Sequence, residues 1–155
     1  ARPAETTEAE WIEFDLDNAL WTIPAARMKA RREHVIPLPS QAVKTLRTLQ
    51  GLTGHRQHLF PGRDNPKGPM TSHSLRQLLK SFGWSGIYSP HATRTTGSTR
   101  LNEMGYRPDA IEAQLAHADT NNVRRTYNHA TYLDERKVMM QEWSDMLDKW
   151  VAGSE

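Results

Sequence analysis

Residues 11–38 read WIEFDLDNALWTIPAARMKARREHVIPL, and this stretch decides the fold class. A half-buried strand alternates apolar with polar residues, and this pattern is present at Ile12, Phe14 and Leu16. A turn at Asp17-Asn18 separates this strand from a second one over residues 19–23. After a basic segment, residues 35–38 (VIPL) predict a short third strand that is ended by prolines. The stretch therefore predicts a three-stranded antiparallel meander whose last connection is the basic loop 28–34.

The rest of the chain has helical patterns. A short acidic helix is compatible with residues 4–10, and PGRDNPKGP at 61–69 is a loop by composition. Start and stop signals predict two helices that begin at serine caps, one from Ser40 to Gly51 and Gly54 and one from Ser72 to Phe82. Two more are predicted over 94–103, ended by Gly105, and over 108–115, opened by Pro108. A short helical piece after Asn121-Asn122 and a helix over 133–150 complete the chain. The expected fold class is α+β and mostly α, a helical domain with a small three-stranded antiparallel sheet at one edge.

Composition excludes several classes of protein. The chain has 155 residues, which suits one domain with a single core, and it contains no cysteine. Disulfides, thiolate catalysis and cysteine-based zinc sites are therefore absent, and the composition is compatible with a reducing cytoplasm. No apolar run approaches the length that spans a bilayer, so no membrane partner is expected.

The formal net charge is only +2, but the charges are unevenly distributed. Residues 1–20 carry one basic and six acidic side chains, a net of −5. Residues 21–133 carry 16 basic and 6 acidic side chains, a net of +10, and residues 134–155 carry 3 and 6, a net of −3. A basic middle between acidic ends indicates a surface for a polyanion such as nucleic acid. The alternative is chance clustering of charges on a solvated surface.

No motif for a nucleotide cofactor or a metal is present. The sequence lacks the phosphate-binding G-x-x-x-x-G-K-[ST], the dinucleotide G-x-G-x-x-G and the zinc-binding H-E-x-x-H. Of the seven histidines only His55 and His58 are close in sequence, and no third ligand lies near them. We therefore expect neither a metal nor another cofactor.

Two polar clusters could carry chemistry. In the first, His91 and Arg94 are three residues apart at a predicted helix start, an arrangement that suits an anion. Taken alone, it could equally be a polar helix cap. The second cluster follows the helix 108–115 and contains His117, Arg124, Arg125 and Tyr127. A lone histidine there would usually be structural, and a lone tyrosine would usually pack. Their combination with the first cluster and the basic middle favours a functional site.

The ordered set Arg2, Lys29, His91-x-x-Arg94, His117 and Tyr127 is similar to the catalytic signature of tyrosine recombinases, the phage integrase family. The match begins with Arg2-Pro3-Ala4-Glu5, the family's R-x-x-E helix, and extends to residues 122–129, so it covers nearly the whole chain. The chain most resembles the integrases of prophages and genomic islands. The resemblance implies that residues 1–155 are a catalytic domain cut from a longer chain whose amino-terminal DNA-binding domains lie upstream, with a tail helix over 132–150.

The resemblance also implies a role for each residue. The implied catalytic residues are Arg2, Lys29, His91, Arg94, His117 and the nucleophile Tyr127. Arg31 and Arg32 compete with Lys29 for the position of the hairpin lysine. Ala116 replaces the glycine of the family's Leu-Gly-His, and Tyr132 is a competitor of Tyr127 because the spacing from His117 is one residue longer than in many relatives. The implied DNA contacts include Arg31, Arg32, Arg124 and Arg125, and further basic residues suited to phosphates are Arg27, Lys67, Arg76 and Lys80.

The implied function is site-specific DNA recombination, the integration and excision of a prophage or genomic island through a covalent 3′-phosphotyrosyl intermediate. The expected partners are double-stranded attachment sites, three further copies of the enzyme in a homotetramer on DNA, and accessory DNA-bending proteins. The isolated fragment could be a monomer. The expected location is the bacterial cytoplasm, at the nucleoid.

Three rival functions stay open at this stage. One is a DNA-binding module without chemistry, one is a type IB topoisomerase, and one is a metal-dependent nuclease. The Met/Trp stripe of the tail helix likewise has two interpretations: it packs on its own core, or it docks on a neighbouring protomer.

Overall fold

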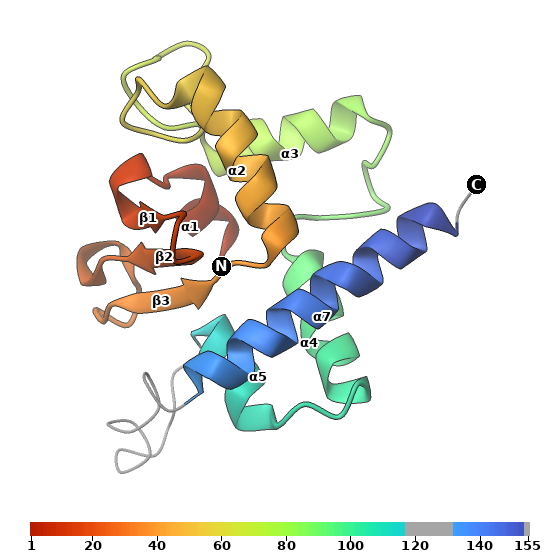
Figure 1. The fold of residues 1–155 in the computed structure, drawn as a ribbon. Coiled ribbons are helices and arrows are strands. Elements are labelled where there is room, and N and C mark those ends of the chain that lie inside the picture. Colours follow the sequence, from red (N-terminus) through yellow and green to blue (C-terminus); the bar gives the residue numbers. More distant parts are fainter. Residues whose placement is uncertain (117–131, 154–155) are drawn as a thin grey trace.

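The computed structural model of the chain describes residues 1–116 and 132–153 (Figure 1). Three short strands, β1 (Phe14–Asp15), β2 (Leu20–Ile23) and β3 (His34–Pro37), form an antiparallel sheet in the order β1-β2-β3. Trp21 pairs with Phe14 on one side and with Ile36 on the other. The α+β class and the three-stranded meander are thus confirmed.

The first strand is much shorter than the alternation predicts. Trp11–Glu13 form a 3₁₀ turn, Ile12 is 91% exposed, and Glu13 is the buried residue. Two polar contacts explain this: the Trp11 indole N–H donates to the Thr53 carbonyl at 3.0 Å, and Glu13 accepts from the Trp21 indole N–H at 2.9 Å. Glu13 also forms an ion pair with Arg27. The prediction of a strand over residues 12–16 with Ile12 facing inward was therefore wrong.

The helices agree with the prediction within a few residues. They are α1 (Pro3–Thr7), α2 (Ser40–Thr53), α3 (Ser72–Ser81), α4 (Ala92–Glu103), α5 (Pro108–Leu115) and α7 (Leu133–Ala152). The 3₁₀ turn Ala25–Arg27 begins the connection from β2 to β3. The helical piece expected after Asn121-Asn122 lies outside the described residues. No described helix has the length and apolar character needed to cross a membrane.

Both predicted serine caps are displaced by one residue. Thr71 is the N-cap of α3, and its hydroxyl accepts the Ser74 N–H at 3.1 Å. Ser40 is the first residue of α2, and its N–H donates to the Gln141 side chain of α7 at 2.9 Å. A side chain distant in sequence therefore satisfies the start of α2, which local sequence cannot reveal.

The apolar core has two parts, and we call the elements that carry them the sheet half and the helical half. One part surrounds the sheet and α2, and its buried members are Ala9, Trp21, Ile23, Met28, Ile36 and Leu59. The other joins α4, α5 and α7 through Leu101, Ile111 and Met139. Burial of this apolar surface stabilises each half.

Buried polar groups join the two halves. Arg136 of α7, only 1% exposed, donates from Nε to Gln114 Oε1 at 2.8 Å and from Nη2 to the Val35 carbonyl at 2.6 Å. His34 Nε2 lies 3.2 Å from the Gln114 carbonyl oxygen. Strand β3, α5 and α7 thus meet at one set of hydrogen bonds, the β3–α5–α7 junction, formed by His34, Val35, Gln114 and Arg136.

The tail helix packs on its own domain over its first half. Met139 is fully buried, and Met140 and Trp143 pack against the α4–α5 cluster. Towards the end of α7, Leu147, Trp150 and Val151 are exposed. Arg100 of α4 lies over the Trp150 ring at 5.7 Å. The core-packing interpretation therefore holds for the first half of the stripe.

The junction predicts a stability that depends on pH. Burial and the neighbouring charge of Arg136 lower the pKa of His34 to about 4, although its hydrogen bond to Gln114 and the charge of Glu5 act in the opposite direction. Between about pH 6.5 and pH 4 the unfolded chain binds a proton that the folded chain excludes. The free energy of unfolding should therefore fall as the pH drops through this window, by roughly 3 kcal/mol at most. Urea titrations at pH 7, 6, 5 and 4.5 measure it.

Two variants assign the effect. His34→Gln should flatten the dependence between pH 6.5 and 5, whereas His55→Gln, at an exposed position, should leave it unchanged. Equal slopes for the wild type and His34→Gln would show that another group is responsible.

Candidate active site

Arg2 is held in place by Glu5. The Arg2 backbone N–H donates to Glu5 Oε2 at 2.5 Å, and Arg2 Nη1 donates to Oε1 at 2.8 Å. Glu5 is only 6% exposed. Burial acts to raise the pKa of Glu5, but the hydrogen bonds and the charge of Arg2 hold it below its usual value. Glu5 is therefore an ionised anchor at neutral pH, and it fixes the guanidinium at the start of α1.

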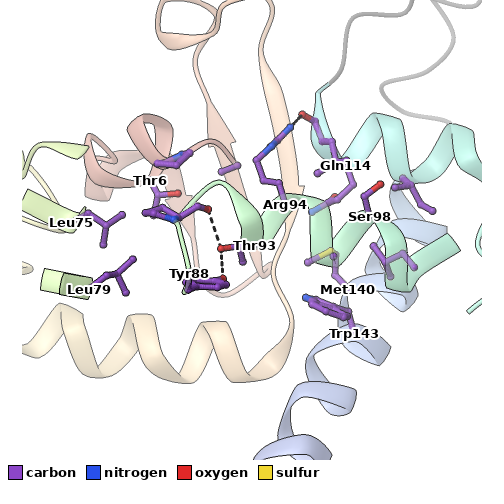
Figure 2. Close-up of a pocket in the computed structure, with 17 residues that line it drawn as sticks. Thr6, Leu75, Leu79, Tyr88, Thr93, Arg94, Ser98, Gln114, Met140 and Trp143 are labelled. Atoms are coloured by element: carbon purple, nitrogen blue, oxygen red, sulfur yellow. Dashed lines mark hydrogen bonds between the residues drawn. The ribbon is translucent and has the colours of Figure 1, made fainter. Parts of the chain in front are cut away.

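Arg94 comes from α4 and extends towards the end of α5, as Figure 2 shows. Its Nη2 donates to the Leu115 carbonyl at 2.8 Å. Burial lowers the pKa of Arg94, and the positive charge of Arg2 lowers it further. The two arginines, 92 residues apart in sequence, are thus close enough in space for their charges to interact. Two clustered guanidinium groups are suited to bind an anion through several oxygens.

Lys29 lies in the same region. Arg2, Glu5, Lys29 and Arg31 line one open depression of about 480 Å³ between α1 and the connection from β2 to β3. The Arg31 N–H donates to the Met28 carbonyl at 2.9 Å, and Arg31 has a positive φ of 53°. This tight turn holds the exposed Lys29 at its tip. The structure thus brings Arg2, Lys29 and Arg31 together, as expected from the sequence.

The other arginines of this connection differ in exposure. Arg32 is partly buried. Arg27 pairs with Glu13 and donates to the Glu5 carbonyl at 2.7 Å. Its charge is compensated inside the domain, so the expectation that Arg27 neutralises DNA phosphate has no support in these contacts.

His91 immediately precedes α4. It is exposed, and its carbonyl accepts the Arg94 N–H at 3.1 Å. The Ser89 hydroxyl accepts the Ala92 N–H at 3.2 Å and so caps this turn. The structure therefore places His91 and Arg94 in the first turn of one helix, as their spacing predicts.

Ala116 ends α5 in the left-handed region, with φ 51° and ψ 40°. This conformation is costly for a residue with a Cβ atom and easy for glycine. Its position explains physically why the resembling family has a glycine before the histidine.

Four of the expected site residues, His117, Arg124, Arg125 and Tyr127, lie outside the described part of the chain. Tyr132, the competing nucleophile, is described. Its hydroxyl accepts from Arg107 Nη2 at 3.1 Å, and the guanidinium lies over its ring at 4.8 Å. Arg107 precedes α5, whereas Arg94 contacts the carbonyl at the other end of that helix. Tyr132 thus pairs with an arginine at the opposite end of α5 from the carbonyl that Arg94 contacts.

Sequence reasoning missed the polar residues behind the site. Arg136 and Gln114 occupy ordinary polar positions of two amphipathic helices, and periodicity gives no sign that both are buried.

An apolar pocket of about 410 Å³ also adjoins Arg94, bordered by α3, α4 and α7 (Figure 2). Within residues 1–116 and 132–153, no three His, Asp or Glu side chains come together as a metal site would require.

Solved structures share this fold. An integrase from mycobacterium phage Brujita matches with a TM-score of 0.68 and 21% identity, over 91% of this chain and 46% of that one. The Tn1549 transposon integrase, solved in complex with circular intermediate DNA, matches with a TM-score of 0.55 and 20% identity, over 90% of this chain and 53% of that one. The chain therefore shares its fold with part of each of these two integrases.

Sequence comparisons show the family. The model of the phage integrase family matches residues 1–134. Prophage integrase IntA of Escherichia coli (strain K12) is 46% identical over 153 residues, which are 99% of this chain and 37% of that protein. The integrase of Shigella phage Sf6 is 40% identical over 151 residues, 97% of this chain and 39% of that protein. The chain belongs to the phage integrase family, and it spans less than two fifths of the length of these two relatives.

The left-handed Ala116 gives a test of the local geometry. Ala116→Gly should raise the free energy of unfolding by about 0.5–1 kcal/mol, because glycine adopts this conformation without a Cβ clash. Ala113→Gly, three residues earlier within α5, should lower it by about 1 kcal/mol. Urea denaturation of the two variants measures both values. Destabilisation of similar size in both would contradict a left-handed residue 116.

Proposed function

We propose that this chain is the catalytic domain of a site-specific DNA recombinase that integrates and excises a prophage or genomic island. The observation that carries the proposal is the position of Arg2, which lines one depression with Lys29 and whose charge acts on Arg94. Three cations from three separate parts of the sequence form a preorganised site for a phosphodiester, in a chain of the phage integrase family.

The first step is attack by the Tyr127 phenol oxygen on the phosphorus of one DNA strand. The tyrosine loses its proton, an O–P bond forms, and the strand becomes linked through its 3′ phosphate to the enzyme. The pentacovalent transition state carries negative charge on its non-bridging oxygens. Arg2 and Arg94 bind these oxygens, with His117 as a further donor, and each such donor is worth roughly 10²–10³ in rate.

The bond that breaks joins phosphorus to the 5′ oxygen of the departing strand. An alkoxide is a poor leaving group, so Lys29 donates a proton to this oxygen as the bond breaks. His91 acts beside Arg94 as a donor, or as the base that accepts the tyrosine proton. A 5′ hydroxyl from another strand then attacks the phosphotyrosine, restoring the tyrosine proton and forming a new phosphodiester, so the bond energy is conserved without ATP.

Basic residues around the site hold the DNA. We propose that four arginines neutralise backbone phosphates, which makes DNA binding weaken as the salt concentration increases: Arg31, Arg32, Arg124 and Arg125.

The substrate is a pair of double-stranded attachment sites, bound by four copies of the enzyme with accessory DNA-bending proteins. The exposed end of α7 (Leu147, Trp150 and Val151) is the surface through which the tail docks on a neighbouring copy. This chemistry occurs on the bacterial chromosome in the cytoplasm.

The covalent intermediate is the most direct test of the proposal. A library of duplexes, each nicked so that the short cleaved strand diffuses away, should trap a DNA–protein adduct that survives denaturation. Sequencing of the trapped strands identifies the attachment site. Tyr127→Phe should abolish the adduct, whereas Tyr132→Phe should preserve it.

Other outcomes identify the rival functions. DNA binding without any adduct would indicate a binding module, and plasmid relaxation without sequence preference would indicate a topoisomerase. Loss of cleavage in a chelator would indicate a metal-dependent nuclease.

A sulfur-substituted strand tests Lys29. On the normal strand Lys29→Ala should slow adduct formation by about 10²–10⁴-fold, because the 5′ oxygen then leaves without a proton. When that bridging oxygen is replaced by sulfur, which leaves readily as a thiolate, Lys29→Ala should cleave nearly as fast as the wild type.

Arg31→Ala and Arg32→Ala serve as matched controls from the same loop. Both variants should weaken DNA binding, and each should slow cleavage of the normal strand and of the sulfur-substituted strand by the same factor. Rescue by sulfur in Arg31→Ala or Arg32→Ala rather than in Lys29→Ala would move the general acid to that residue.

A further inference from the structure

Arg136 is the most completely buried charged side chain of the described residues, at 1% exposure. Among the described residues, its guanidinium donates to two neutral oxygens, Gln114 Oε1 at 2.8 Å and the Val35 carbonyl at 2.6 Å. Burial lowers the pKa of Arg136 to about 10, so the guanidinium stays charged at neutral pH. Burying a charge costs free energy, and an apolar side chain of similar size often gives a more stable core. A purely stabilising role therefore explains this residue poorly.

The contacts of Arg136 lead to two parts of the candidate site. Val35 follows the connection that carries Lys29 and belongs to β3. Gln114 is adjacent to Leu115, whose carbonyl accepts the hydrogen bond from Arg94. The Gln114 carbonyl is in turn held by His34, at 3.2 Å. One guanidinium thus fixes the spacing between the strand behind Lys29 and the helix end that orients Arg94.

We propose that Arg136 is a positioning residue that sets the distance between the Lys29 loop and Arg94 by clamping β3 to the end of α5. This inference rests on the proposed function, since it assigns Lys29 and Arg94 to one phosphodiester. The planar fork of arginine reaches both acceptors at once, whereas the single ammonium of lysine cannot hold both in that geometry. A shift of about 1 Å between catalytic groups can cost about 10²-fold in rate.

The test compares Arg136→Lys with Arg100→Lys. Arg100 also joins α4 to α7, through the Trp150 ring, but it is exposed and distant in sequence from the Lys29 loop. Both variants keep the positive charge, and the folded fraction of each is measured by urea denaturation. Per folded molecule, Arg136→Lys should slow adduct formation by roughly 10–100-fold, and Arg100→Lys should leave it unchanged.

Two further readouts separate positioning from stability. In a double-mutant cycle, Arg136→Lys should cost much less in an Arg94→Lys background than in the wild type, because both changes disturb the same contact. Gln114→Glu, which keeps an acceptor oxygen for Arg136, should retain cleavage, whereas Gln114→Leu should lose it. Additive effects in the cycle, or a loss that only follows the unfolded fraction, would overturn the proposal.

Hydrogen exchange keeps the inference testable apart from catalysis. In Arg136→Lys, exchange should become faster in peptides covering residues 28–35 and 110–116 and remain unchanged in α2. If the wild type forms no adduct, the proposed function is refuted. The exchange pattern then still shows whether Arg136 clamps β3 to the end of α5. Unchanged exchange in both segments would refute the clamp.

Discussion

The candidate active site depends on holding two positive charges together. Arg2 and Arg94 come from helices far apart in sequence, and the charge of Arg2 acts on Arg94 strongly enough to lower its pKa. Such a pair opposes folding unless other groups compensate it. Glu5 compensates Arg2 through two hydrogen bonds, and the Leu115 carbonyl holds Arg94. Arg2 also lines the depression that holds Lys29, where a phosphodiester would complete the compensation.

The architecture serves this arrangement. The sheet half presents the Lys29 connection and the helical half presents Arg94. Arg2, at the start of α1, lines the depression with Lys29, and its charge acts on Arg94. The two halves have separate buried clusters, and Ala116 at the end of α5 packs against the sheet cluster, so apolar contact is one part of what fixes their relative position. Directional hydrogen bonds at the β3–α5–α7 junction are another part, and directionality is what a site accurate to about 1 Å requires.

Much of this could be predicted from the sequence, and the reasons are physical. The meander follows from the alternation, turns and prolines of residues 11–38, and α5 follows from Pro108 at its first turn. The family signature predicted that Arg2, Lys29 and Arg94 share one site, and in the structure Arg2 lines one depression with Lys29 and its charge acts on Arg94. The failures came from contacts distant in sequence. The Trp11 indole bonds to Thr53 and turns the expected first strand into a 3₁₀ segment, and Gln141 satisfies the start of α2. Arg136 could not be recognised because its acceptors lie on β3 and α5.

The central claim is that Arg2 and Arg94 stabilise negative charge on the non-bridging oxygens of the reacting phosphate. A methylphosphonate at the cleaved position removes one of those charges and leaves the rest of the strand intact. The account predicts that Arg94→Ala slows cleavage of the normal strand by roughly 10²–10³-fold but cleaves the methylphosphonate strand almost as fast as the wild type does. An equal loss of rate on both strands would contradict it.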